Sequence, residues 1–69
     1  MDFHFTNDRP IYLQIAEQLE CYIIAGHFPP GEKLPSVRDL ALYAKVNPNT
    51  MQKALTELEQ HRIITTERT

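Results

Sequence analysis

The sequence has few of the residues from which cross-links and phosphate loops are made. Its 69 residues include one cysteine, two glycines and no tryptophan. The single cysteine, Cys21, excludes an internal disulfide and a cysteine-based zinc site, and we expect it to be a partly buried apolar residue of a helix. With only Gly26 and Gly31, the chain has no glycine-rich loop for a phosphate.

The chain also lacks any cluster of titratable residues suited to catalysis. The histidines are isolated, with no paired spacing on a predicted helix; they are His4, His27 and His61. Metal binding and acid–base catalysis need several such groups in one place. We therefore predict no metal, no cofactor and no enzymatic activity.

Long hydrophobic runs are absent as well. No apolar run approaches the roughly 18 residues that a membrane-spanning helix needs, and no signal peptide is recognisable. These absences predict a soluble cytoplasmic protein. A chain of 69 residues forms one domain at most, here residues 1–69, and such a domain buries only about 60% of its unfolded surface.

Positive charge is scarce overall but concentrated in one stretch. The chain carries a net charge of −2, made up of −4 over residues 1–32, +3 over residues 33–53 and −1 over residues 54–69. A surface that binds DNA requires a local excess of basic residues. The middle stretch is therefore where the sequence indicates contact with nucleic acid.

An amphipathic helix is predicted over residues 11–23, because apolar residues recur there at helical spacing. These residues are Ile11, Ile15, Leu19, Tyr22 and Ile23. Asp8 is a candidate amino-terminal cap, Pro10 suits the first turn, and Gly26 is expected to end the helix. The helix is long enough to form the back of a three-helix core.

Two more helices, joined by a tight turn, are predicted between residues 36 and 60. Ser36 is the expected cap of the first, which ends at Lys45 and Val46. Asn47 precedes a proline and suits the cap of the second, with Pro48 at its first position. Their apolar residues recur at helical spacing and are Val37, Leu40, Ala41, Ala44, Met51, Ala54, Leu55 and Leu58.

The last of these helices carries polar residues and no acid opposite its apolar stripe. These residues are Asn49, Gln52, Lys53, Thr56 and Gln60. Such side chains can hydrogen-bond base edges and phosphates in a major groove. Two helices, a short turn and a polar face of this kind form a helix-turn-helix. The alternative is a helical hairpin whose polar face is simply solvated.

A small amount of β-structure is also predicted. Residues 63–67 are rich in β-branched residues and predict a strand, and residues 32–34 allow a second, short one. We therefore predict a mainly α fold, a three-helix winged helix-turn-helix with a small and here incomplete β-wing. Phe3 and Phe5 are expected to pack on its body. The predicted core comprises Ile15, Leu19, Ile23, Leu40, Ala41, Leu55, Leu58 and Ile63.

Several stretches between residues 9 and 67 form a specific pattern. They include Arg9-Pro-Ile-Tyr-Leu-Gln-Ile15, Pro30-Gly31, Lys33-Leu-Pro-Ser-Val-Arg-Asp-Leu-Ala41, Val46-Asn-Pro-Asn-Thr50 and Ala54-Leu-Thr-Glu-Leu-Glu59. This pattern resembles the amino-terminal DNA-binding domain of the GntR family of bacterial transcription regulators, and within it the YtrA subfamily. Leu-Pro-Ser-x-Arg together with Val-Asn-Pro-Asn-Thr at this spacing makes the resemblance specific.

The resemblance implies roles for individual residues. Arg38 would reach DNA, and Ser36 would lie at the phosphate-facing start of its helix. The residues that would open the recognition helix in the major groove are Asn47, Pro48, Asn49 and Thr50. Gln52 would touch DNA further along. For Lys53, the alternative to a phosphate contact is a solvated side chain. For Arg38, the alternatives to a DNA contact are pairing with a neighbour and capping a carbonyl.

Partners are implied in the same way. Family members act as homodimers on inverted-repeat operators in double-stranded DNA, and we expect a repressor that responds to a small effector. The second wing strand and the carboxy-terminal effector and dimerisation domain are expected to lie outside this chain. The sequence departs from the family at two positions: Pro48 replaces an arginine of many members, and Arg62 replaces a glycine that commonly follows the helix.

A different class of function stays open, that of a winged-helix module which binds proteins and never touches DNA. The acidic net charge is compatible with such a module, whereas the acid-free helix face and the basic stretch favour DNA. An enzyme is disfavoured by the lack of a titratable cluster. The tyrosines are expected to be core or half-buried packing residues; they are Tyr12, Tyr22 and Tyr43.

Overall fold

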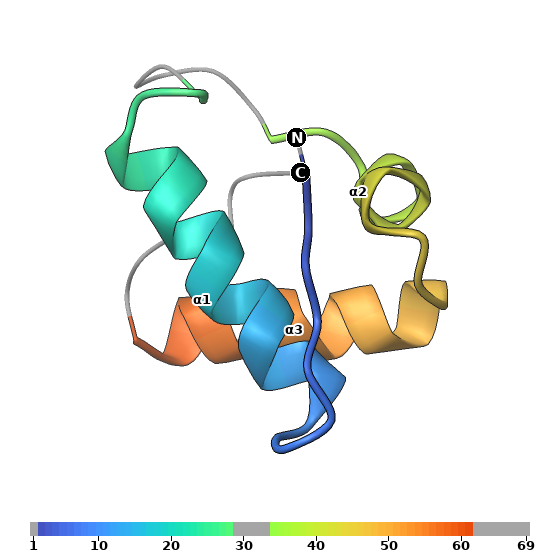
Figure 1. Ribbon diagram of the computed structural model, residues 1–69. Helices are drawn as coiled ribbons and strands as arrows, with labels where there is room; N and C mark the ends of the chain where they lie inside the picture. Colours follow the sequence, from blue (N-terminus) through green and yellow to red (C-terminus); the bar gives the residue numbers. More distant parts are fainter. Residues whose placement is uncertain (1, 29–33, 62–69) are drawn as a thin grey trace.

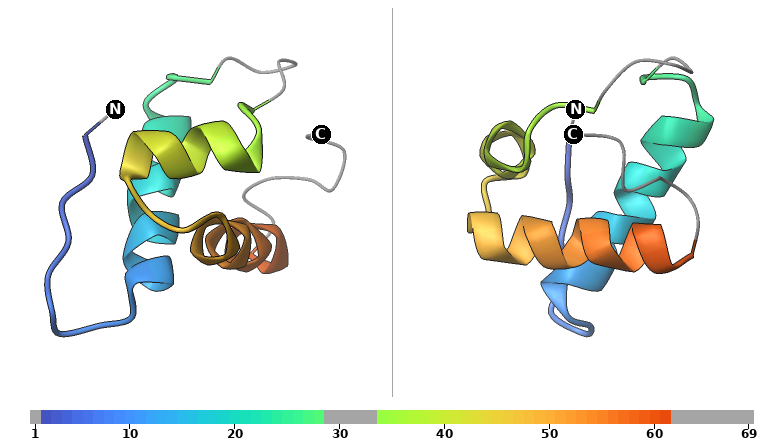
Figure 2. Two further views of the ribbon diagram at one scale, coloured as in Figure 1. Left: turned by 90° about the vertical axis from the view of Figure 1, so that its right-hand side faces the viewer. Right: turned by 180° about the vertical axis from the view of Figure 1, so that it is seen from behind.

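The computed structural model describes residues 2–28 and 34–61, which hold three helices (Figure 1). Helix α1 comprises Ile11–Ile24, α2 comprises Val37–Ala44 and α3 comprises Pro48–Gln60. In Figure 1, α1 crosses α3, while α2 is seen end-on beside the amino-terminal half of α3; the views in Figure 2 agree. This arrangement confirms the predicted mainly α helix-turn-helix class.

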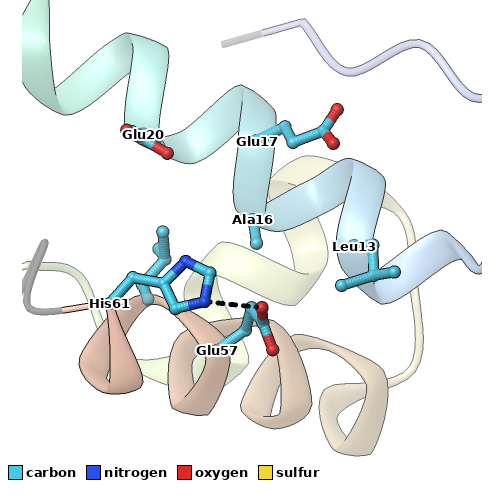
Figure 3. A pocket seen from close by; sticks show the side chains of 7 residues that line it. Leu13, Ala16, Glu17, Glu20, Glu57 and His61 are labelled. Carbon is cyan, nitrogen blue, oxygen red and sulfur yellow. Dashed lines mark ion pairs between the residues drawn. The ribbon is translucent and has the colours of Figure 1, made fainter.

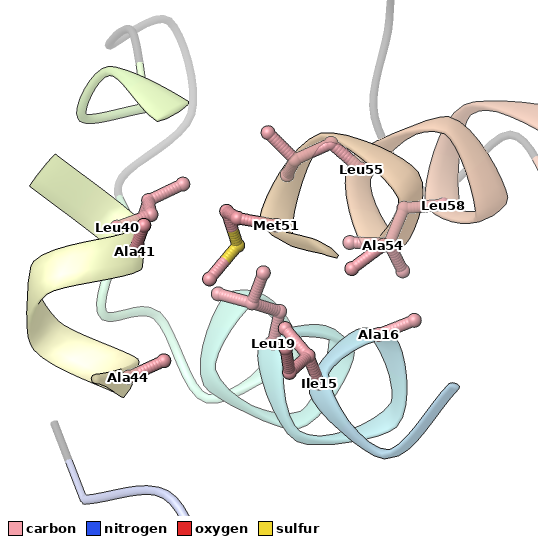
Figure 4. Close-up of a cluster of buried hydrophobic side chains, with 10 residues drawn as sticks. All are labelled: Ile15, Ala16, Leu19, Leu40, Ala41, Ala44, Met51, Ala54, Leu55 and Leu58. Atoms are coloured by element: carbon pink, nitrogen blue, oxygen red, sulfur yellow. The ribbon is translucent and has the colours of Figure 1, made fainter. Parts of the chain in front are cut away.

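One apolar core joins the three helices (Figure 4). Its members are at most 5% exposed and are Ile15, Ala16, Leu19, Leu40, Ala41, Ala44, Met51, Ala54, Leu55 and Leu58. Met51 of α3 points between α1 and α2 and so ties all three helices together. The predicted core is confirmed except at two positions: Ile23 is only half-buried, and Ile63 lies outside the described residues.

Helix α1 begins differently from the prediction. Pro10 occupies the cap position and forms no side-chain cap, while its carbonyl accepts a 3.3 Å hydrogen bond from Gln14 N–H. The carboxylate of Asp8 instead accepts a hydrogen bond from the Thr6 hydroxyl, so the prediction of an Asp8 cap is wrong. The proposed stop at Gly26 is confirmed, because this glycine follows the helix with a φ of +89° that side-chain-bearing residues disfavour.

Residues 2–6 form an extended arm along α1, drawn in dark blue in Figure 1. Side chains one helical turn apart hydrogen-bond the backbone of alternate arm residues: Gln14 with Thr6, Gln18 with His4, and Tyr22 with Asp2. The spacing matches because four helical residues advance about 6 Å and two extended residues about 6.8 Å. The alternate side chains, Phe3 and Phe5, are half-buried against the core, as predicted.

Some sequence-based expectations are wrong or lie outside the described residues. Cys21 is exposed rather than partly buried, because it lies on the solvent side of α1. Tyr43 is 54% exposed, whereas Tyr12 and Tyr22 are half-buried as expected. Residues 2–28 and 34–61 contain no strand, Leu34 included, and the strand predicted at 63–67 lies outside them.

Candidate nucleic-acid interface

The turn between α2 and α3 is three residues long, Lys45 to Asn47. Lys45 adopts the left-handed conformation with a φ of +59°, and Val46 N–H donates to Ala41 O over 3.0 Å. This bond closes the end of α2 in the way that a carboxy-terminal glycine usually does. A left-handed residue other than glycine costs about 1–2 kcal/mol. The turn therefore redirects the chain sharply into α3.

Both helices of this unit start at the predicted caps. Ser36 Oγ accepts a 3.1 Å hydrogen bond from Asp39 N–H, and Asn47 Oδ1 accepts a 2.7 Å bond from Asn49 N–H. Pro48 occupies the first helical position, where its missing N–H carries no penalty. The caps fix where each helix begins, and so they fix which residues face solvent in its first turn.

Arg38 lies in the first turn of α2 and is exposed. Within the described part of the chain, its guanidinium forms neither an ion pair nor a hydrogen bond to a carbonyl. The structural alternatives weighed for this residue, pairing with a neighbour or capping a carbonyl, are therefore not realised in the described residues. As far as these residues are concerned, its charge remains available to a partner.

A recognition face, defined here as Asn49, Gln52, Lys53, Thr56 and Gln60, covers the outer side of α3. All five residues are exposed, whereas the opposite side of the helix is buried in the core. Gln52 Nε2 donates a long, 3.4 Å hydrogen bond to Thr56 Oγ1, which itself donates to Gln52 O over 3.0 Å. Thr50, also a predicted site residue, is half-buried beside this face.

Lys53 has a partner that the sequence did not indicate. Its Nζ lies 4.5 Å from the centre of the Tyr12 ring, a cation–π contact between α3 and the first turn of α1. The two residues lie far apart in the sequence, so no spacing rule connects them. Tyr12 thus reaches the edge of the recognition face, a role beyond the packing predicted for it.

The carboxy-terminal end of α3 has the opposite electrostatic character. A hollow of about 120 Å³ lies there between α1 and α3, and Figure 3 shows three of its carboxylates, those of Glu17, Glu20 and Glu57. Glu57 Oε2 lies 3.2 Å from His61 Nε2. Because these carboxylates repel phosphates, the hollow marks the limit of any DNA-facing surface rather than part of it.

Arg9, which lies just before the start of α1, is already paired. Its guanidinium forms two hydrogen bonds to the Glu17 carboxylate, of 2.5 and 2.9 Å. The hydrogen bonds from Arg9 lower the pKa of Glu17, and the same bonds raise the pKa of Arg9. Arg9 is therefore less available to DNA than Arg38 or Lys53.

Neither a metal site nor a membrane span is found in the part that the structure describes. No group of three or more histidine, cysteine, aspartate or glutamate side chains there could hold a metal ion. None of the three described helices is long and apolar enough to cross a bilayer.

The predicted site residues fall into two groups, one at the start of each helix of the unit. The group at α2 is Ser36 and Arg38, and the group at α3 is Asn47, Pro48, Asn49, Thr50, Gln52 and Lys53. A capped helix, a tight turn and a second capped helix with an exposed, acid-free polar face define a DNA-binding helix-turn-helix domain.

Comparison with known proteins identifies the family. The family described as "Bacterial regulatory proteins, gntR family" matches residues 11–69. The chain belongs to the GntR family of bacterial regulatory proteins, as its sequence motifs had indicated. No solved structure matches the chain at a significant level.

Three relatives are transcriptional regulators by name. The HTH-type transcriptional regulator YhcF of Bacillus subtilis is 47% identical over 99% of this chain and 56% of its own length. The HTH-type transcriptional repressor YtrA of the same organism is 51% identical over 83% of this chain and 44% of its own length. The HTH-type transcriptional regulator Rv1152 of Mycobacterium tuberculosis is 41% identical over 84% of this chain and 48% of its own length. The chain thus spans about half the length of these curated relatives.

Proposed function

We propose that residues 1–69 form the DNA-reading domain of a bacterial transcription regulator, which binds double-stranded DNA sequence-specifically. The observation that carries this proposal is the recognition face of α3, which is exposed, polar and free of acid along its length. Side chains of this kind on the second helix of a helix-turn-helix reach base edges in the major groove. The domain acts without a cofactor and as a binding protein rather than an enzyme.

Each group of site residues takes a separate task in this proposal. Ser36 and Arg38 at the start of α2 contact phosphates and set the register of the domain on the duplex. The α3 group enters the major groove, where Asn49, Thr50 and Gln52 read bases and Lys53 contacts phosphate. Asn47 and Pro48 fix the start of the helix that carries these residues.

The regulator as a whole is proposed to act in the cytoplasm as a repressor. The relative YtrA is a transcriptional repressor by name, which supports this direction of regulation. Two such domains in a homodimer would bind the halves of an inverted-repeat operator, about one helical turn apart. A small effector would bind the carboxy-terminal part of the protein and change the placement of the two domains.

The alternative, a module that binds only proteins, makes a different prediction for salt dependence. We would measure fluorescence anisotropy of mixed-sequence duplex DNA with the chain at about 50 and about 200 mM salt. If Arg38 and Lys53 each displace one counterion, the affinity should fall roughly tenfold over this range. A matched chain with Arg38→Gln and Lys53→Gln should lose this dependence.

Absence of binding at low salt, from a chain shown by circular dichroism to be folded, would contradict DNA binding by the single domain. The same titration with a longer, dimeric protein then separates two explanations. Binding by the dimer would show that two domains are needed, whereas no binding would favour the protein-interaction module.

A further inference from the structure

A fixed aromatic ring holds the end of a flexible side chain at the edge of the recognition face. The Tyr12 ring is half-buried and packs on the core, so its position is set by α1. Lys53 is exposed on α3, and its Nζ lies 4.5 Å from the centre of that ring. This distance is within the range of about 6 Å over which a ring attracts an ammonium group.

The carboxylate at the usual ion-pair spacing from Lys53 is turned toward another side chain. Glu57 lies one helical turn further along α3, at the spacing that favours a lysine–glutamate ion pair. Its carboxylate instead lies 3.2 Å from His61 Nε2. Across residues 2–28 and 34–61, no carboxylate forms an ion pair with Lys53. Within the described residues, the ammonium is therefore held in place while its charge stays unneutralised.

We propose that Tyr12 is a positioning residue for the DNA contact of Lys53, a role that rests on the proposed function. The ring holds the ammonium at the edge of the recognition face next to α1, where it meets a DNA phosphate. An ammonium has three N–H donors, so those turned away from the ring can donate to phosphate oxygens. A lysine confined before binding loses less side-chain entropy when the complex forms.

A ring that merely competed with DNA for the ammonium would have the opposite effect, because its removal would strengthen binding. A direct contact from the Tyr12 hydroxyl is a third possibility, and it would be lost on removal of the oxygen alone. The test must therefore separate the electron-rich face of the ring from its shape and from its hydroxyl.

Chemical synthesis of the 69-residue chain allows such a test. Tyr12→Phe removes only the hydroxyl, and Tyr12→3,4,5-trifluorophenylalanine keeps the apolar packing while it withdraws electron density from the ring face. We expect the first variant to bind mixed-sequence duplex DNA as the unchanged chain does, and the second to bind about two- to fivefold more weakly at about 50 mM salt. With Lys53→Met in both chains, this difference should vanish.

A second measurement reports the contact without DNA. The proton resonances of the Lys53 ε-methylene should be shifted upfield by the ring in the free chain, both with tyrosine and with phenylalanine at position 12. Equal DNA affinity of the phenylalanine and trifluorophenylalanine chains would overturn the positioning role, as would a difference that persists with Lys53→Met. If the ring shift is present but neither the unchanged chain nor a longer, dimeric protein binds DNA, the proposed function itself fails, and the positioning role with it.

Discussion

Gln14 and Gln52 are the same residue type on two helices of one domain, but their surroundings differ completely. Gln14 is 3% exposed, and its amide makes three hydrogen bonds to the backbone: Oε1 accepts from Thr6 N–H, and Nε2 donates to the carbonyls of Thr6 and Arg9. Gln52 is exposed, and among the described residues its amide makes a single long bond, to Thr56. A side-chain amide can make four hydrogen bonds in all, so Gln14 uses most of its capacity and Gln52 little of it.

This difference separates the structural part of the molecule from the part proposed to bind DNA. On α1, polar side chains bind the backbone of the amino-terminal arm. Arg9, which lies just before α1, forms an ion pair with Glu17 of that helix. On the outer side of α2 and α3, Arg38 forms no ion pair within the described residues, and the amide of Gln52 has most of its hydrogen-bonding capacity left. Unused donors and acceptors on a rigid helix are what a base edge or a phosphate requires.

The largest effect is expected from Gln14→Ala. The change leaves the partly buried N–H and carbonyl of Thr6 without their partner and frees the arm with Phe3 and Phe5. We expect a loss of about 2–3 kcal/mol in the free energy of unfolding, or about 10–20 °C in Tm for a domain of this size. Thermal unfolding followed by circular dichroism measures it.

Gln52→Ala is the matched control for that experiment, and its Tm should lie within about 3 °C of the unchanged chain. DNA affinity provides the crossed comparison, since Gln14→Ala should leave it unchanged at temperatures where the domain is folded. A large loss of stability from Gln52→Ala, or none from Gln14→Ala, would remove the distinction between the two helices.

Next in size is Arg38→Ala. An arginine that contacts phosphate should contribute about 2 kcal/mol to binding, equally for operator and mixed-sequence DNA, and its removal should lower the slope of log affinity against log salt by about one. Anisotropy titrations over a range of salt measure both quantities. Arg9→Ala, in which the lost charge was paired with Glu17, should change DNA affinity much less. Equal effects of the two changes would argue against the phosphate contact.

A smaller and more selective effect is expected from Gln52→Ala on DNA binding. Its amide must exchange the bond to Thr56 for a base, so we expect about 1–2 kcal/mol, confined to one base pair of the operator. Competition between an operator selected from random sequences and its single-base variants measures this preference. Equal losses on operator and scrambled DNA would refute base reading by this residue.

Much of the fold could be predicted from local sequence patterns. The stripe of Leu19 and its neighbours, the Ser36 and Asn47 caps and the proline after Asn47 act over three or four residues, and all of them are confirmed. The error at Asp8 is also local in origin. Aspartate is a residue type that favours the cap position of a helix. Only the path of the chain shows that Pro10 occupies that position and that the Asp8 carboxylate meets the Thr6 hydroxyl instead.

The features that escaped prediction depend on tertiary placement. Nothing in the sequence distinguishes Gln14, which binds the arm, from Gln52, which faces solvent, since both lie on amphipathic helices. The contact of Tyr12 with Lys53 joins two helices that only the fold brings together. Lys45 carries no signal for a left-handed φ, because the turn imposes that conformation on a residue that ordinarily avoids it.

The smallest effect concerns the paired charges of α1. Arg9 lowers the pKa of Glu17 in the folded domain through its hydrogen bonds, so this pair stabilises the fold above the ordinary glutamate pKa of 4.5. That contribution is lost as the pH falls through the lowered, folded-state pKa. The pair is exposed, so Glu17→Gln should lower Tm at pH 7 by no more than about 3 °C.

The hydrogen bond from Thr6 lowers the pKa of Asp8, so Asp8 adds a pH dependence of stability with the same sign. Asp8→Asn is therefore made as a second variant, to separate this contribution from that of Glu17. Between pH 6 and pH 3, the difference in Tm between the unchanged chain and Glu17→Gln should shrink. A difference that stays constant to pH 3 would mean that the charge of Glu17 contributes nothing to the fold, and that Arg9 is as free as Arg38 to meet DNA.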